Sequence, residues 1–185
     1  YELEKKQLDL LLRQRVDGIL ISIANTTRNF THLSDVISQG KPLVMFDKIA
    51  KILECSKVVI DDRKAAKVAT QHLIDTGCKR IAHFRGPLLA QNSIDRFLGY
   101  KEALEENNFT YDSSLVYICE CGDSSFEEGK FNAKKLIQDH DDIDGVFINT
   151  DLVAIGALTV FTEMGIKVPD DISIVGFSNW FMASV

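Results

Sequence analysis

Six polar side chains in this sequence are placed where a ligand-binding crevice of an α/β protein would need them. Five end or follow predicted buried strands, and the sixth is an arginine in the first turn of a predicted helix. Because parallel strands end at one edge of a sheet, these side chains are expected at the edge where open α/β sheets bind ligands. The six residues are Ser22, Asp47, Arg96, Thr150, Asp151 and Ser178. The set predicts a binding crevice rather than a reaction centre.

The arginine is the most informative of the six residues. A planar guanidinium can donate two parallel hydrogen bonds to vicinal hydroxyls or to a carboxylate, which a lysine cannot reproduce. The alternative role is a surface or interlobe salt bridge. Both roles stay open for Arg96 at this point.

The sequence offers no recognisable catalytic motif. It contains no glycine-rich phosphate loop, no G-x-G-x-x-G fingerprint, no H-E-x-x-H zinc motif and no G-x-S-x-G nucleophile elbow. The four histidines are scattered; His72 fits a helix face and His83 a strand, so packed or surface positions are expected for them. The four cysteines form no C-x-x-C pair, and the acids of residues 139–144 are typical of a solvated turn. We therefore predict no catalytic residue, no metal site and no cofactor.

Composition is that of an ordinary globular protein. Of the 185 residues, 45% are hydrophobic and 26% are charged, which is enough for one substantial core or two small ones. The formal net charge of −6 provides no basic field for nucleic acid, so any contact with DNA must come from a segment outside these residues. Free cysteines are typical of a reducing cytosol, and the longest apolar runs are too short to cross a bilayer. These features favour a cytoplasmic protein without a membrane partner.

The stretch of residues 63–100 must position the arginine. Apolar residues at helical spacing predict a helix that ends at Gly77, and residues 80–84 form a short apolar strand. The Gly86-Pro87 pair ends that strand. Ser93 is the expected N-cap of the next helix, which would place Arg96 in its first turn.

The rest of the chain alternates predicted strands with predicted helices. This alternation is typical of βαβ units with parallel sheets, and a boundary between two such sets is expected near Asp61 and Asp62. The predicted helices are residues 1–14, 31–39, a segment after Ser124, and 152–164. The predicted buried strands are residues 19–21, 41–47, 57–61, 115–119, 144–149 and 171–177. The expected fold class is therefore α/β.

Six segments of the chain resemble the lactose/galactose repressor (LacI-type) family of bacterial transcription regulators in their order and spacing. They are VDGILIS, KPLVMFDK, VVIDDRKAAKVATQHLIDTGCKRIAHFRGP, RFLGY, FINTDLVAIGAL and VPDDISIVGFSNW. The resemblance implies a two-lobed core of the type I periplasmic-binding-protein-like fold, in which each lobe is a parallel sheet flanked by helices. It also implies a sensing and dimerisation domain that couples a small effector, such as a sugar, to a helix-turn-helix head that binds operator DNA.

The resemblance implies how the chain is divided. Residues 1–61 would be part of the first lobe without its first strand and helix, residues 62–178 the second lobe, and residues 179–185 the start of a crossover back to the first lobe. The chain would then be a core fragment that is truncated at both ends.

The resemblance also implies roles for single residues. Arg96 matches the family's effector-binding arginine, Asp47 and Ser22 match crevice positions of the first lobe, and Thr150 with Asp151 match the pair at the head of a helix in the second lobe. Ser178 stands where many sugar-responsive members carry an aspartate, and Ser124 replaces an aromatic residue often used for stacking on the effector. Trp180 or Phe126 could supply an aromatic wall instead, but core packing is the expected role of both.

In the mechanism that the resemblance implies, an effector held by Arg96 on one lobe and Asp47 on the other biases the angle between the lobes, and that angle sets the spacing of two DNA heads in a homodimer. Two other functions stay open at this point. A periplasmic sugar-binding protein of a transporter would have the same crevice but no DNA head. A sugar-acting α/β enzyme would need an acid or nucleophile that the sequence does not supply.

Overall fold

The chain forms two compact units. A computed structural model describes residues 1–120 and 125–184. The first unit comprises Tyr1–Asp61 together with Leu88–Asn92, and the second comprises Asp62–Pro87 together with Ser93–Val185. No helix of the described residues is both long and apolar enough to cross a membrane.

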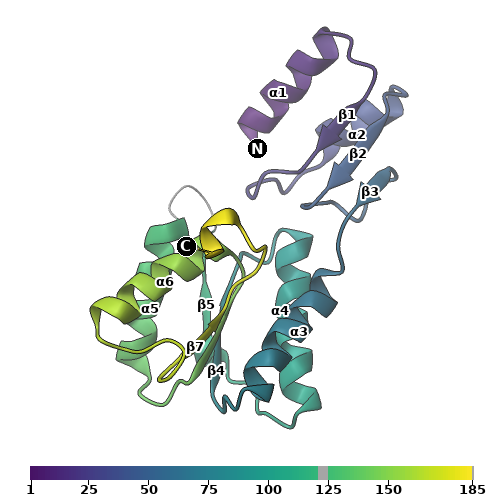
Figure 1. Cartoon of the computed structure of the whole chain (residues 1–185). Helices are drawn as coiled ribbons and strands as arrows, with labels where there is room; N and C mark the ends of the chain where they lie inside the picture. The colour runs from purple at the N-terminus through teal and green to yellow at the C-terminus, as the bar shows by residue number, and fades with distance from the viewer. Residues whose placement is uncertain (121–124, 185) are drawn as a thin grey trace. The chain divides into compact units, whose positions relative to one another are not determined.

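The first unit is a three-stranded parallel sheet with two helices (Figure 1). Its strands lie in the order β1-β2-β3 and pair in parallel. The elements are α1 (Glu2–Arg13), β1 (Ile19–Ile21), α2 (Thr31–Ser38), β2 (Leu43–Phe46) and β3 (Ser56–Val58). The predicted α/β class with parallel strands is confirmed here.

One face of this sheet carries the core of the unit. Ile19 pairs with Leu43 and Ile21 pairs with Met45, so these side chains share a face because side chains alternate along a strand. Both helices contribute to the same apolar cluster, α1 through Leu8 and α2 mainly through Leu33 and Val36. Helix α1 is therefore an amphipathic helix that buries one apolar stripe.

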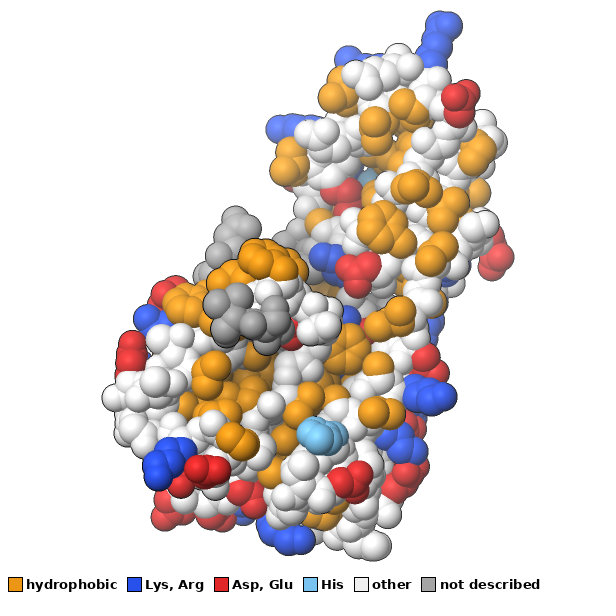
Figure 2. Space-filling view, in the orientation of Figure 1, with side chains coloured by type: hydrophobic (Ala, Val, Ile, Leu, Met, Phe, Trp, Pro, Cys, Tyr) orange, Lys and Arg blue, Asp and Glu red, His pale blue; other side chains and the backbone are white. Residues whose placement is uncertain are grey.

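The opposite face of the same sheet is exposed. Leu20, Phe46 and Val58 are 74%, 45% and 66% exposed, and Figure 2 shows hydrophobic side chains gathered over the strands of this unit. The prediction that residues 57–61 form a buried strand is wrong, because β3 is an exposed edge strand. Both helices pack on the other face, and within the described part of the unit no further element covers this one.

A buried carboxylate, that of Glu4, joins α1 to the rest of the first unit. Its Oε2 accepts a hydrogen bond from the backbone N–H of Ala24 at 2.5 Å. Its Oε1 lies 3.0 Å from the Thr27 hydroxyl and 2.7 Å from Nε2 of His32 in α2. The side chains of Glu4 and His32 are each only 8% exposed. One side chain thus connects the first helix, the loop after β1 and the second helix.

Replacing Glu4 with alanine is expected to destabilise the first unit by about 2 kcal/mol, because buried donors lose a charged acceptor. Urea unfolding followed by circular dichroism measures the change. The matched control is Glu2→Ala, an exposed acid on the same helix, which should change stability by less than about 0.5 kcal/mol. Equal effects of the two substitutions would contradict this role of Glu4.

The second unit is a four-stranded parallel sheet with helices on both faces. The strand order is β5-β4-β6-β7. Helices α3 and α4 lie on one side of the sheet and α5 and α6 on the other (Figure 1). The helices are α3 (Asp62–Asp75), α4 (Gln91–Glu106), α5 (Ser125–Asp139) and α6 (Asp151–Glu163). The strands are β4 (Ile81–Arg85), β5 (Val116–Ile118), β6 (Gly145–Ile148) and β7 (Ser173–Val175), with 3-10 turns η1 (Ser113–Leu115) and η2 (Phe181–Ser184).

The two central strands of this unit are buried on both faces, as their apolar sequences predicted. All four residues of β6 and the first four of β4 are buried. His83, in the middle of β4, has no solvent exposure, and its ring stacks on that of Phe147 with 4.7 Å between centroids. Its Nδ1 lies 2.9 Å from the carbonyl oxygen of Phe147. The expectation that His83 is a packed residue is confirmed.

The start of α4 differs from the prediction. The helix begins at Gln91, so Ser93 is its third residue rather than its N-cap, and Arg96 lies in the second turn. Ser93 is buried and faces Gly86, where a Cβ atom would overlap its hydroxyl oxygen. A serine that packs inward against a glycine has the same local signature as a capping serine, which explains the error.

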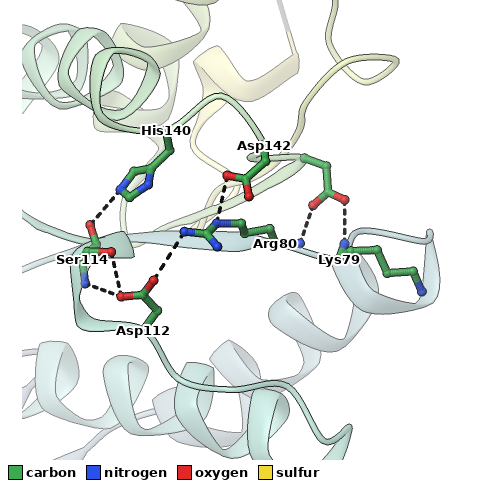
Figure 3. A network of polar contacts seen from close by, with 7 residues as sticks. Lys79, Arg80, Asp112, Ser114, His140 and Asp142 are labelled. Carbon is green, nitrogen blue, oxygen red and sulfur yellow. Dashed lines mark hydrogen bonds and ion pairs between the residues drawn. The ribbon is translucent and has the colours of Figure 1, made fainter.

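The acidic turn before β6 is held by specific partners rather than simply solvated. Figure 3 shows Arg80 between two acids, with Nη2 3.4 Å from Asp112 and Nε 3.0 Å from Asp142. Asp144 accepts the backbone N–H groups of Lys79 and Arg80 at 2.6 and 2.8 Å. Hydrogen bonds from the side chain and backbone of Ser114 hold the pKa of Asp112 below its usual value. These contacts join the loops at the amino ends of β4, β5 and β6.

Candidate functional site

Arg96 is the centre of a compact cluster in the second unit. Its Nε donates to Oδ1 of Asp62 at 2.7 Å, and its Nη1 donates to the backbone carbonyl of Asn149 at 2.7 Å. The guanidinium carbon lies 3.8 Å from the ring centroid of Phe177, a distance typical of a cation–π contact. The side chains of Arg96 and Asp62 are 10% and 8% exposed. These three contacts therefore fix the guanidinium in one orientation.

The cluster forms at the carboxyl edge of the second sheet. Asn149 directly follows β6, and Phe177 follows β7 by two residues. Asp62 is the first residue of α3, where the positive end of the helix dipole favours a carboxylate. Since the strands are parallel, their ends bring these residues to the same edge. The sequence prediction placed Arg96 at this edge.

The electrostatics of the cluster explain how a charge can be buried there. An unpaired guanidinium would lose its hydration on burial, which is unfavourable unless the charge is paired and hydrogen-bonded. Asp62 supplies the opposite charge, and the Asn149 carbonyl supplies an acceptor. Within the described chain, Nη2 of Arg96 makes no hydrogen bond. The fixed guanidinium of Arg96 can therefore still donate hydrogen bonds from Nη2 to a ligand.

The three other predicted site residues of the second unit have different surroundings. Thr150 precedes α6 without a side-chain capping bond, and its buried hydroxyl has no hydrogen-bond partner among the described residues. Asp151 is buried, and its Oδ2 accepts the backbone N–H of Trp180 at 2.5 Å. Ser178 is exposed and has a φ of 98°, in the left-handed region. The structure thus places Thr150 next to Asn149 of the Arg96 cluster, whereas Asp151 binds the segment after β7.

In the first unit, the two predicted residues lie together. Ser22 follows β1 and Asp47 follows β2, and the serine hydroxyl donates to Oδ2 of Asp47 at 3.4 Å. Asp47 is exposed and has a φ of 55°. A short polar surface therefore lies at the carboxyl edge of the first sheet.

The aromatic residues considered as a wall of the site have different surroundings. Trp180 is 45% exposed, so the expectation of core packing is wrong for it; its ring makes an edge contact with Phe181, with 4.6 Å between centroids. Phe126 is half-buried, with the ammonium of Lys130 5.6 Å from its ring centroid. Ser124 lies outside the described residues.

Sequence reasoning missed three residues that contact Arg96. Asp62, Asn149 and Phe177 were read as the start of a helix, the end of a strand and the end of a strand. Asn149 ends a strand just as Thr150 follows it, so the same positional signal could have found it. Nothing local marks Asp62 as the partner of an arginine 34 positions away.

The site shows no arrangement suited to a metal ion. Among the residues that the structure describes, no group of three or more histidine, cysteine, aspartate or glutamate side chains is placed to hold a metal. The Arg96 cluster combines one cation, its counter-ion, a carbonyl and an aromatic face. Such a set can orient and bind a polar ligand.

Sequence comparison identifies the class of this fold. Residues 70–185 match the family described as the periplasmic binding protein-like domain. The chain belongs to this family. Its relatives within it are LacI-type transcriptional regulators, which confirms the resemblance seen in the sequence.

The relatives are similar over nearly the whole chain. The ribose operon repressor of Halalkalibacterium halodurans is 34% identical over 96% of this chain and 50% of its own length. Catabolite control protein A of Priestia megaterium is 33% identical over 95% of this chain and 53% of its own length. This chain therefore spans about half the length of the curated relatives that it matches.

Solved structures give the same result. The transcription regulator CcpA of Lactococcus lactis is 32% identical with a TM-score of 0.86, covering 98% of this chain and 64% of that chain. A complex of the transcriptional regulator CelR with cellobiose is 32% identical with a TM-score of 0.83, covering 95% of this chain and 53% of that chain. These relatives are named as transcriptional regulators and not as enzymes.

Proposed function

We propose that this chain is the effector-sensing and dimerisation part of a cytoplasmic transcriptional regulator, a repressor that binds a small molecule such as a sugar. Operator DNA would be bound by a helix-turn-helix segment that is not among these residues, since their formal net charge of −6 suits no DNA surface. Relatives named as an operon repressor and as a transcriptional regulator favour this function over a periplasmic transport protein.

The observation that carries the proposal is the orientation of Arg96. Its guanidinium is fixed by Asp62, Asn149 and Phe177 at the carboxyl edge of a parallel sheet, where α/β proteins bind ligands. Thr150, Asp151 and Ser178 of the second unit, and Ser22 and Asp47 of the first, are proposed as further effector contacts on the strength of the family resemblance.

In this proposal, effector binding is coupled to operator binding by thermodynamic linkage. An effector changes operator binding only as far as it prefers one arrangement of the dimer over another, typically by about 1 to 3 kcal/mol. Whether the effector induces or corepresses depends on which arrangement it prefers.

Calorimetric titration with ribose and cellobiose, the molecules that the names of two relatives contain, is the first experiment. In the variant Arg96→Lys, affinity for whichever sugar binds is expected to fall at least about tenfold, because an ammonium cannot reproduce the planar fork. Circular dichroism of the variant checks that it is folded. An unchanged affinity in folded Arg96→Lys would remove Arg96 from the site.

A further inference from the structure

The charge of the Arg96 site is already balanced before any ligand binds. Asp62 accepts from Nε of Arg96 at 2.7 Å, and both side chains are about nine-tenths buried. In so buried a place, two opposite charges interact more strongly than on the surface. A ligand therefore meets the arginine and its carboxylate as a neutral pair.

The charged residues at the carboxyl edge of the second sheet include two acids and two arginines. Asp62 begins α3, Asp151 begins α6, Arg85 ends β4, and Arg96 lies in α4. Arg85 donates to the Gly86 carbonyl at 2.9 Å and lies 5.6 Å from the Phe97 ring centroid, so its guanidinium already has two partners. The formal charges of the four residues cancel. An anion bound to Arg96 would lie close to the buried Asp62 carboxylate.

We propose that Asp62 determines the charge specificity of this site: it fixes Arg96 through Nε and cancels its charge, so that the site takes uncharged, hydroxyl-bearing ligands and rejects their phosphorylated counterparts. Hydroxyl oxygens can accept from the remaining N–H groups of the guanidinium without requiring a net positive charge. A phosphate would place like charge beside Asp62, which is unfavourable in a partly desolvated site. The inference rests on the proposed function, because it names the ligand class of the same Arg96 site.

The test compares matched pairs of ligands on the full chain by calorimetric titration. The pairs are ribose with ribose 5-phosphate, glucose with glucose 6-phosphate, and adenosine with AMP. The wild-type chain is expected to bind the neutral member of a pair at least about tenfold more tightly than the phosphorylated member.

The variant Asp62→Asn removes the carboxylate charge but keeps an oxygen that can accept from Arg96. In it, the ratio of affinities is expected to shift by about tenfold or more toward the phosphorylated member, since Arg96 is no longer neutralised. Asp61→Asn is the matched control, because it removes the charge of the adjacent, exposed acid. That control should leave the ratio within about twofold of wild type.

Asp62→Glu keeps the negative charge and should keep the preference for neutral ligands, which tests the charge even if Asp62→Asn fails to fold. A wild-type preference for the phosphorylated member, or an unchanged ratio in folded Asp62→Asn, would overturn the charge-selection role and leave the proposed function standing. If no member of any pair binds the folded wild-type chain, the proposed function fails and the inference fails with it.

Discussion

Replacing Gly156 with valine is expected to lower the free energy of unfolding of the second unit by about 3 kcal/mol, at the upper end of overpacking effects. Gly156 in α6 lies against the backbone of α5, and a Cβ atom there would overlap the carbonyl oxygen of Phe126. Gly129 in α5 has the reciprocal contact with the carbonyl oxygen of Val153 in α6. Since both obstructing atoms belong to backbone, no side-chain rotation can make room.

Urea unfolding followed by circular dichroism tests this prediction. The matched control is Thr162→Ala on the exposed side of the same helix, which should change stability by less than about 0.5 kcal/mol. Gly156→Ala should also destabilise, although alanine normally favours a helix over glycine by about 1 kcal/mol. A stabilised Gly156→Ala variant would show that α5 and α6 can separate at little cost.

The strands of the second unit could be predicted from sequence because their signal is local. Residues 80–84 and 144–149 are short apolar runs bounded by polar or glycine residues, and both became central strands buried on two faces. The exposure of β3 could not be predicted in this way. The predicted strand, residues 57–61, has an apolar centre of three residues, as residues 144–149 do. Burial of a strand, however, depends on which elements cover the sheet, and the local sequence does not contain that information.

The candidate site was predictable in position but not in its contacts. The edge of the sheet follows from the strand ends, so Arg96, Thr150 and Asp151 could be found. The partners of Arg96 lie 34 and 53 positions away, and only the tertiary register brings Asp62 and Asn149 to it. Tertiary packing also decides the role of Ser93. Its side chain is buried against Gly86, so the residue predicted as a helix cap is part of the packing.

The second unit is expected to lose stability in mild acid because of His83. Burial, reinforced by the charges of Arg85 and Arg96, lowers the pKa of His83 from 6.5 to about 3, although the hydrogen bond with Phe147 acts in the opposite direction. A histidine in an unfolded chain has a pKa near its ordinary value, so below about pH 6.5 the unfolded state binds a proton that the folded state does not. Stability due to neutral His83 is therefore full above that pH and is lost as the pH falls toward 3.

The size of the effect follows from the pKa difference. One unit of pKa corresponds to about 1.4 kcal/mol, so lowering the pH from 7.5 to 5 should cost the folded state about 2 kcal/mol through His83 alone. In His83→Phe, which keeps an aromatic ring stacked on Phe147, this part of the pH dependence should disappear. The comparison uses the slope of stability against pH, so a uniform change in stability caused by the substitution does not affect it.

The measurement is urea unfolding of both proteins at pH 7.5, 6 and 5. His72 provides the control, because its side chain is exposed on α3 and not packed in the core as His83 is. His72→Gln should thus retain the wild-type slope, while His83→Phe should be less sensitive to acid by about 2 kcal/mol at pH 5. Equal slopes in wild type and His83→Phe would mean that His83 becomes protonated within the folded unit, which its stacked and fully buried position is expected to prevent.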